Sequence, residues 1–159
     1  MSAKAPEEIA DELVAELAQR LRFSDLSFDA NRVCRLVFDD VHEIDIEQPE
    51  GSSEMILHSL VTKVAATGRE ALYRQCLAGN FFGGDAGNAT LCLDPHRDEI
   101  LLYRRLPLPG TDIITLENAI LELVGHLDQV KSSIQAASAQ VGMQPPLEMD
   151  EAWRRRMSL

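Results

Sequence analysis

Hydrophobic and polar residues follow different periods along this chain, and each period predicts a different element. Apolar side chains recur at every fourth position through residues 6–22, which is the spacing of an amphipathic helix. The period falls to two in residues 34–38 and again in 44–46, which predicts two strands. Residues 55–62 are apolar on both faces, so we expect a third strand that is covered on both sides. Short connections between these strands predict an antiparallel meander.

The second half of the chain predicts a further helix, a hairpin and a last helix. Residues 69–78 have helical spacing, and Gly79 is placed to act as the C-terminal cap of that helix. Residues 90–93 and 99–105 predict the two strands of a hairpin around a turn at 94–98. The order helix, three strands, helix, two strands, helix defines the expected fold class. It is α+β, with an antiparallel twisted sheet of about five strands and three helices.

The last predicted helix has the most regular pattern in the chain. From Ile113 its apolar positions are alternately three and four residues apart over four heptads, which is the spacing of a coiled-coil seam. Leu121 and Val124 widen the first half of this stripe, so we expect that half to lie on the sheet. At 1.5 Å per residue the helix reaches about 40 Å, more than a small sheet needs. The seam consists of Ile113, Leu116, Ile120, Leu123, Leu127, Val130, Ile134, Ala137 and Val141.

Gly142 and the pair Pro145-Pro146 are expected to end this helix, which divides the chain into a domain at 1–142 and a tail at 143–159. Two interpretations of the tail stay open. It is either disordered, or it is a docking element anchored by the only tryptophan and a basic cluster. The residues concerned are Trp153, Arg154, Arg155 and Arg156.

The charge balance narrows the classes of partner. The chain has 26 acidic residues against 15 lysines and arginines, a net charge of −11, and such a surface repels nucleic acid and anionic lipid. The acidity either only keeps the protein in solution or attracts a cationic or amphipathic protein client. Cys34, Cys76 and Cys92 have apolar neighbours, which predicts reduced, buried thiols in a reducing cytosol. The N-terminus does not have the pattern of a signal peptide, and no apolar run approaches the ~20 residues of a membrane span.

No group of residues predicts catalysis, a cofactor or a metal. His96-Arg97-Asp98 matches part of the kinase catalytic loop, but Tyr103 stands where that loop needs an asparagine. His42-Glu43 does not have the second histidine of a zinc-protease helix. The glycine-rich segment 82–87 is not followed by the lysine of a phosphate-binding loop. We therefore expect that the protein is not an enzyme.

Four segments, taken with the order of elements, resemble a known family. Residues 33–40 resemble the opening hairpin of the Tir-chaperone (CesT) family, a group of type III secretion chaperones, and residues 77–80 resemble its helix-ending Leu-x-x-Asn. Residues 89–94 and 101–108 resemble its strand after the turn and its final strand. The resemblance covers about three-quarters of the chain, and it excludes the end of the heptad helix and the tail.

The resemblance implies a cytoplasmic bacterial homodimer that binds the extended N-terminal region of effector proteins. Such a chaperone keeps its clients soluble and export-competent and promotes their delivery to the secretion apparatus, whose ATPase is a further candidate partner. Nucleic acid and membrane insertion are not expected. The resemblance places the dimer contact on the second helix and the strand after it, at Leu72, Cys76, Phe81, Phe82, Leu91 and Leu93. The candidate client contacts, which could instead form the core of the monomer, are Leu13, Leu17, Leu21, Ile44 and Ile46.

Two other functions stay open at this point. The chain could be a helical scaffold or regulatory protein that acts through the C-terminal heptad helix, in which case truncation before Ile134 would abolish its oligomers. It could also be a small α+β enzyme or ligand-binding module that uses the loop 81–88. The second alternative is the weaker one, because few polar residues converge on that loop.

Overall fold

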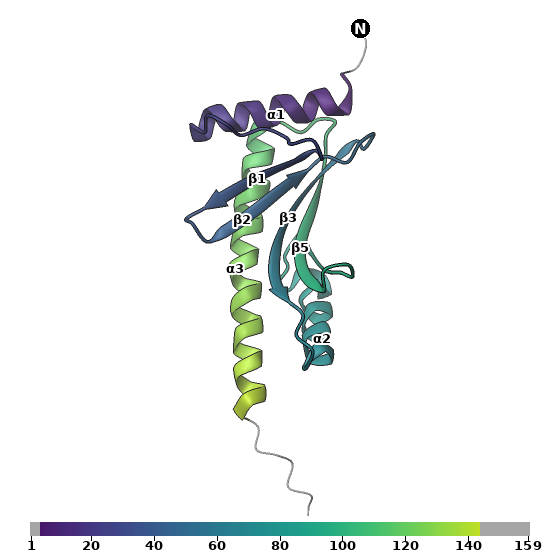
Figure 1. Ribbon diagram of the computed structural model, residues 1–159, viewed down its shortest axis with the longest axis vertical. Coiled ribbons are helices and arrows are strands. Elements are labelled where there is room, and N and C mark those ends of the chain that lie inside the picture. Colours follow the sequence, from purple (N-terminus) through teal and green to yellow (C-terminus); the bar gives the residue numbers. More distant parts are fainter. Residues whose placement is uncertain (1–3, 144–159) are drawn as a thin grey trace, which may run out of the picture.

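The computed structural model describes residues 4–143, with the side chains placed as far as residue 139 (Figure 1). Three α-helices, one 3-10 turn and five strands make up this part of the chain. The order of the elements is the one that the sequence predicts, so the α+β fold class is confirmed. The elements are α1 Pro6–Leu21, β1 Val33–Phe38, β2 His42–Glu47, β3 Glu54–Lys63, α2 Arg69–Gly79, η1 Phe81–Gly83, β4 Thr90–Asp94, β5 Glu99–Pro107 and α3 Ile113–Met143.

The five strands form one antiparallel sheet in the order β1-β2-β3-β5-β4. Leu36 is opposite Ile44 across the first pair of strands, and Leu91 is opposite Leu102 across the last. The expected meander therefore accounts for β1 to β3, while the later hairpin adds its second strand, β5, directly to β3. As a result β1 and β4 are the two edges of the sheet.

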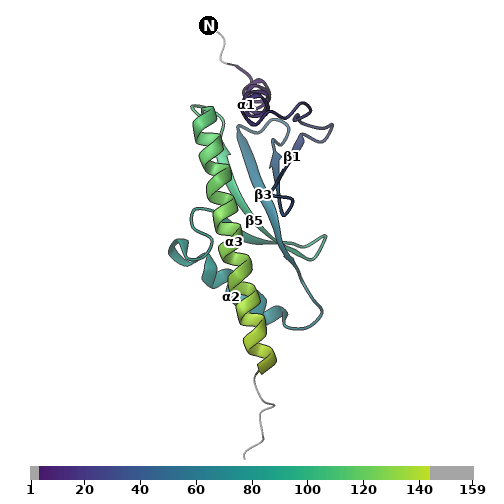
Figure 2. The same cartoon turned by 90° about the vertical axis from the view of Figure 1, so that its left-hand side faces the viewer.

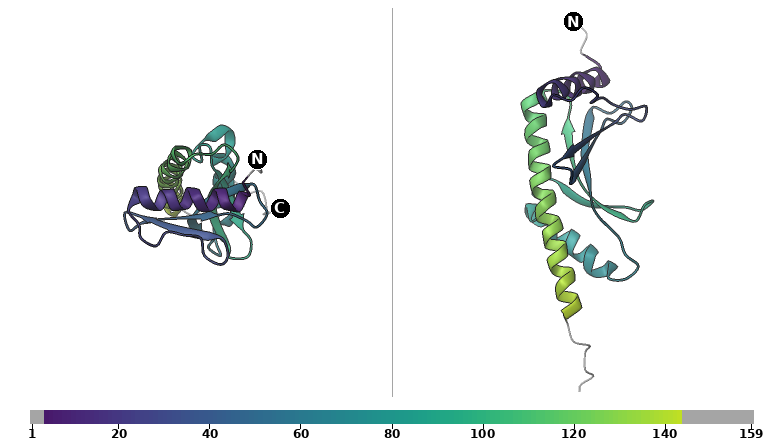
Figure 3. Two further views of the ribbon diagram at one scale, coloured as in Figure 1. Left: turned by 90° about the horizontal axis from the view of Figure 1, so that it is seen from above. Right: turned by 60° about the vertical axis from the view of Figure 1, so that its left-hand side comes forward.

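The three helices are arranged around one face of the sheet. Helix α3 lies along that face and packs against β3, β5 and β2, while α1 crosses the upper end of α3 (Figures 1 and 2). Helix α2 lies beside the lower part of α3 and against β4 (Figure 3). The core is the space between α1, α3 and the inner sheet face. Its largest fully buried side chains are Leu17, Leu36, Ile44, Ile46, Met55, Leu57, Ile100, Leu102, Leu108, Leu116, Leu123 and Leu127.

The outer face of the sheet has no helix on it among the described residues (Figure 3). Ile56 and His58 of β3 are half-buried there, and Leu60 is exposed. The expectation that β3 is covered on both sides was therefore wrong for one face. The alternation rule does not detect this, because Leu and Ile at outward positions have the same pattern whether or not a partner covers them.

The backbone is left-handed at two turns, and one helix end differs from the expectation. Asp39 and Asp40 both have positive φ, as expected for a tight hairpin turn between β1 and β2. Gly87 also has positive φ and lies under the ring of His126. Gly79, by contrast, has no positive φ; a Cβ added there would lie 3.1 Å from a methyl carbon of Leu91. The absence of a side chain at Gly79 thus permits close packing of α2 on β4. Gly79 is not the left-handed cap that we expected.

Helix α3 confirms the prediction for its first half with one exception. Leu116, Ile120, Leu123, Leu127 and Val130 are buried against the sheet and the other helices. Leu121, which we expected to widen this contact, is 64% exposed on the opposite side of the helix. The 31 residues of α3 span about 46 Å. Its last turns extend past the sheet beside α2.

Candidate interaction surfaces

The described residues contain no group of three or more His, Cys, Asp or Glu side chains that could hold a metal ion. The cysteines do not form a reactive site either. Burial raises the pKa of the Cys34 thiol to about 11, with a smaller contribution from the negative charge of Asp45. Burial also raises the pKa of Cys76 and of Cys92. Protonated thiols are poor nucleophiles.

The predicted client contacts are mostly inside the molecule. Leu13 and Leu17 lie on the buried face of α1, and Ile44 and Ile46 are fully buried on β2. In this conformation these four side chains form the core of the monomer, which is the alternative that the sequence left open. Only Leu21, which is 36% exposed at the end of α1, is accessible to a partner.

Other apolar side chains of the neighbouring segments are exposed where the sequence did not place a contact. Phe23 follows α1, Val37 points outward from β1, and Val41 lies in the turn after it. The end of α1 and the β1–β2 turn lie on the same side of the molecule (left in Figure 1). We call Leu21, Phe23, Val37 and Val41 the α1–β1 surface. The sequence alone does not show whether an apolar side chain at an outward position contacts a partner.

The edge of β1 adds backbone groups to this surface. Strand β1 pairs with β2 on one side, and no described strand pairs with its other side. Alternate N–H and C=O groups therefore point away from the sheet, which is how an edge strand can accept another strand. Arg35 on this strand is bound to Asp45 of β2 by two hydrogen bonds of 2.7 and 2.8 Å, so its charge is already paired.

The predicted dimer contacts divide into buried and exposed residues. Cys76 and Leu91 are buried, and Leu72 is half-buried. Phe81 and Leu93 are exposed, and Phe82 is 94% exposed. These residues come from α2, η1 and β4, and the fold brings those elements together at one edge of the sheet.

One further exposed residue belongs to the same region. Leu77 on α2 is 72% exposed and precedes the two phenylalanines by one helical turn. We call Leu77, Phe81, Phe82 and Leu93 the α2 patch. Large exposed apolar side chains that gather in one region mark interaction sites on soluble proteins.

The backbone holds the α2 patch in an unusual conformation. Phe82 has φ 48° and ψ 40°, the left-handed region that costs a bulky residue roughly 1–2 kcal/mol. The rings of Phe81 and Phe82 are in contact, with centroids 4.4 Å apart. An aromatic side chain that is both strained and exposed indicates a function for the turn.

Asn80 fixes this turn to the sheet. Its side-chain oxygen accepts a hydrogen bond of 2.8 Å from the Leu91 N–H, and its amide donates one of 3.1 Å to the Leu91 carbonyl. The amide thus satisfies both backbone groups of Leu91 on the free edge of β4, as a neighbouring strand would. This contact gives a physical role to the asparagine of the Leu-x-x-Asn segment.

Comparison with known proteins supplies the family. The model of the Tir chaperone protein (CesT) family matches residues 12–131, from the middle of α1 to the second half of α3. The chain belongs to the Tir chaperone family. The Tir chaperone of Escherichia coli O157:H7 is 23% identical over 118 residues, which is 74% of each chain. The Tir chaperone of Citrobacter freundii is 24% identical over the same shares.

Solved structures show that the fold is shared with chains of two known complexes, one of which is described as a chaperone–effector complex. A chain in the crystal structure of the ExsC–ExsE complex superposes with a TM-score of 0.68 at 18% identity, covering 82% of this chain and 96% of that one. A chain in the structure of the HopA1–SchA chaperone–effector complex gives a TM-score of 0.66 at 14% identity, covering 82% and 99%.

The family assignment confirms the resemblance that the sequence showed. This member of the Tir chaperone family is a type III secretion chaperone, a protein that binds effectors. Its family and its structural relatives are chaperones and not enzymes. No helix among the described residues is long and apolar enough to cross a bilayer.

Proposed function

We propose that this chaperone acts as a homodimer in the bacterial cytoplasm and binds the extended N-terminal segment of one or more effectors. Binding keeps the effector soluble and export-competent and presents it to the secretion apparatus, whose ATPase is the candidate recipient. The observation that carries this proposal is the pair of separate exposed apolar surfaces on a chain of this family. One surface serves the second copy and the other serves the client. Neither requires a cofactor or catalysis.

The α2 patch is the proposed dimer contact. Large aromatic side chains each bury about 150–250 Å² when a partner covers them, so Phe81 and Phe82 of two copies supply much of a small interface. A two-fold interface is self-complementary, which suits a compact patch at one edge of the molecule. Cys76 and Leu91 of the same elements are buried in the core, and Leu72 is half-buried.

The α1–β1 surface is the proposed client contact. An extended segment can pair its backbone with the edge of β1 while alternate side chains cover Val37 and its neighbours. The four buried candidates, Leu13, Leu17, Ile44 and Ile46, then act indirectly, because they hold α1 and β2 in place. Ordering an extended client costs several kcal/mol, which leaves a moderate and reversible affinity.

The scaffold alternative receives less support from the structure. Five seam positions of α3 from Leu116 to Val130 are buried against the protein's own sheet and helices, so they cannot form a coiled coil with another chain. Only the last part of the seam, from Ile134, extends beyond the sheet. This length is too short for the four-heptad zipper that the pattern suggested.

Native mass spectrometry of the chaperone co-expressed with the N-terminal segment of an effector tests the proposal. We expect two copies of this chain with one effector segment. Val37→Asp combined with Val41→Asp is expected to lower effector affinity at least tenfold and leave the dimer intact. Leu121→Asp, an equally exposed apolar site on α3, is the matched control and should bind like the wild type. A dimer that ignores every effector offered, or a doubly substituted protein with full affinity, would contradict the proposed client surface.

A further inference from the structure

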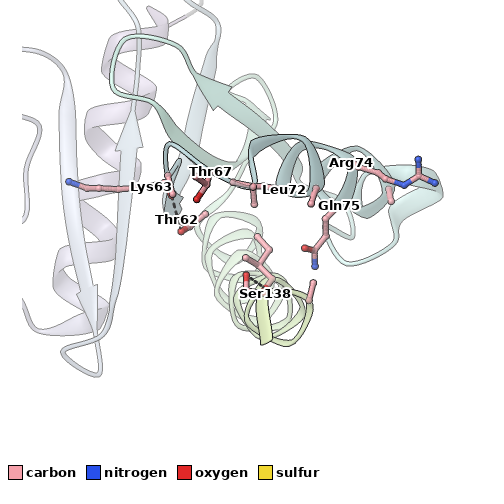
Figure 4. A pocket seen from close by; sticks show the side chains of 13 residues that line it. Thr62, Lys63, Thr67, Leu72, Arg74, Gln75 and Ser138 are labelled. Carbon is pink, nitrogen blue, oxygen red and sulfur yellow. Dashed lines mark hydrogen bonds between the residues drawn. The ribbon is translucent and has the colours of Figure 1, made fainter. Parts of the chain in front are cut away.

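A groove lies between α2 and the last turns of α3 (Figure 4). Its volume is about 690 Å³, within the range of pockets that accept small molecules or single large side chains. Small and apolar side chains of both helices line it, while Lys63, Gln75 and Ser138 lie around them. The apolar lining consists of Ala65, Gly68, Ala71, Leu72, Ala78, Ile134 and Ala137.

The groove exists because α3 is longer than the sheet it covers. Val130 is buried, but Ile134 is only partly buried and Ala137 is half-exposed, although all three belong to one apolar stripe. The Gln75 amide donates a 3.1 Å hydrogen bond to the Ser133 hydroxyl, which holds α2 against α3 at the upper end of the groove. Below that contact the small side chains of both helices leave the space open.

We propose that the C-terminal segment 144–159 of the same chain docks in this groove, anchored by Trp153. These residues lie outside the part of the chain that the structure describes, and that part ends close to the groove. Helix α3 ends at Met143, five residues after Ser138 on the groove. That distance is about 8 Å along the helix axis.

The length of the segment is sufficient for the chain to return to the groove. Ten residues separate Met143 from Trp153, and such a length spans up to about 33 Å when extended. Pro145 and Pro146 cannot continue the α3 helix, so the chain is free to leave its axis. No other part of the protein is needed to bring Trp153 to Ile134.

The composition of the segment complements the groove. Met149, Trp153 and Met157 are spaced four residues apart and would share one face of a helix, while the groove offers alanines on which an indole can lie. Arg74 borders the groove, and no described carboxylate forms an ion pair with it (Figure 4). Acidic residues precede the tryptophan, at Glu148, Asp150 and Glu151. A second copy or an effector could also fill an apolar groove, but neither is tethered beside it as segment 144–159 is by the end of α3.

The fluorescence of the full-length protein tests this proposal directly, because Trp153 is its only tryptophan. We expect blue-shifted emission and weak quenching by acrylamide. Ala137→Arg fills the groove and should shift the emission to that of an exposed indole, with quenching increased several-fold. Ala136→Arg is the matched control: Ala136 is exposed, does not line the groove, and should leave the emission unchanged. Circular dichroism of both variants checks that they are folded.

Co-expression separates docking on the same chain from docking on a second copy. The Ala137→Arg chain keeps its tryptophan but has a blocked groove, whereas a Trp153→Phe chain has an open groove and no tryptophan. We expect the mixed sample to show an exposed indole. Recovery of the blue-shifted emission would overturn the proposal in favour of a second copy. An exposed indole in the wild-type protein, or equal effects of the two arginine variants, would overturn docking in this groove.

Discussion

At the scale of single residues, Phe82 and Asn80 show how much the turn after α2 depends on individual side chains. Phe82 stores strain in a left-handed backbone conformation and exposes its ring, while Asn80 binds both backbone groups of Leu91. A local sequence pattern predicts a turn here but not which residue takes the positive φ. The glycines at 83 and 87 have positive φ, and Phe82 does so as well.

Phe82→Gly is expected to weaken the dimer at least tenfold while relieving backbone strain. The ring is lost from the α2 patch, and glycine adopts φ 48° without the penalty of roughly 1 kcal/mol that a larger residue incurs. Sedimentation equilibrium measures the dimer. Phe82→Ala removes the same ring but keeps the strain, so at concentrations where both are monomeric the glycine variant should be the more stable of the two. Equal dimerisation of Phe82→Gly and wild type would exclude the patch as the interface.

Asn80→Ala should lower the free energy of unfolding by about 1–3 kcal/mol, because the buried polar groups of Leu91 lose both of their partners. Urea denaturation provides the measurement. Asn80→Asp is the informative companion, since it retains an acceptor for the Leu91 N–H but places a carboxylate oxygen against the Leu91 carbonyl. A change below about 0.5 kcal/mol for alanine would mean that water replaces the amide without loss.

The Cys34 thiol predicts a pH dependence of stability at high pH. Its pKa is raised by burial to about 11, above the ordinary value near 8.5 in an unfolded chain. The folded state therefore favours the protonated thiol, and this contribution is fully present below about pH 8.5 and lost as the pH rises through 11. Cys34→Val should show a smaller decrease in unfolding free energy between pH 8.5 and 11 than the wild type. Parallel pH profiles of the two proteins would contradict this.

At the scale of elements, the periodicities predicted every helix and strand in the correct order, because each element buries one face on the same core. They could not predict whether the apolar face of an element packs against the same chain or against another protein. Leu17 and Ile46 have the same spacing whether they contact their own sheet or an effector, and in the structure they are buried in the monomer. Leu77 and Leu121 have apolar helical spacing and are nevertheless exposed. Three-dimensional packing decides between these cases, and the sequence pattern does not contain it.

Removal of residues 134–159 tests which half of α3 matters for function. We expect the shortened protein to fold and to bind effector, with a lower Tm, because the residues buried on the sheet end at Val130 and Ile134 is only partly buried. Native mass spectrometry should still show a dimer, since the α2 patch is intact. Loss of the dimer in a shortened protein that remains folded would restore the scaffold interpretation.

At the scale of the whole molecule, the two proposed surfaces lie at different levels along α3. Near its start, Glu117 pairs with Arg20 of α1 at 2.5 Å. Further along the helix, Ser133 accepts the hydrogen bond from Gln75 of α2. The family and the fold could be read from the sequence because they depend on the order of elements. This separation could not, because it depends on how α1 and α2 are placed along a single helix.

The length of α3 bears on how long a client segment must be to bind in the proposed way. Sixteen helical residues separate its contact with α1 from its contact with α2, a distance of about 24 Å. An extended polypeptide needs about seven residues to cover that length. In a dimer joined through α2, an effector segment that reaches the α1 ends of both copies must cover it twice. In the proposed dimer, this length sets a minimum of about fourteen residues for the stretch of effector that lies between those two ends.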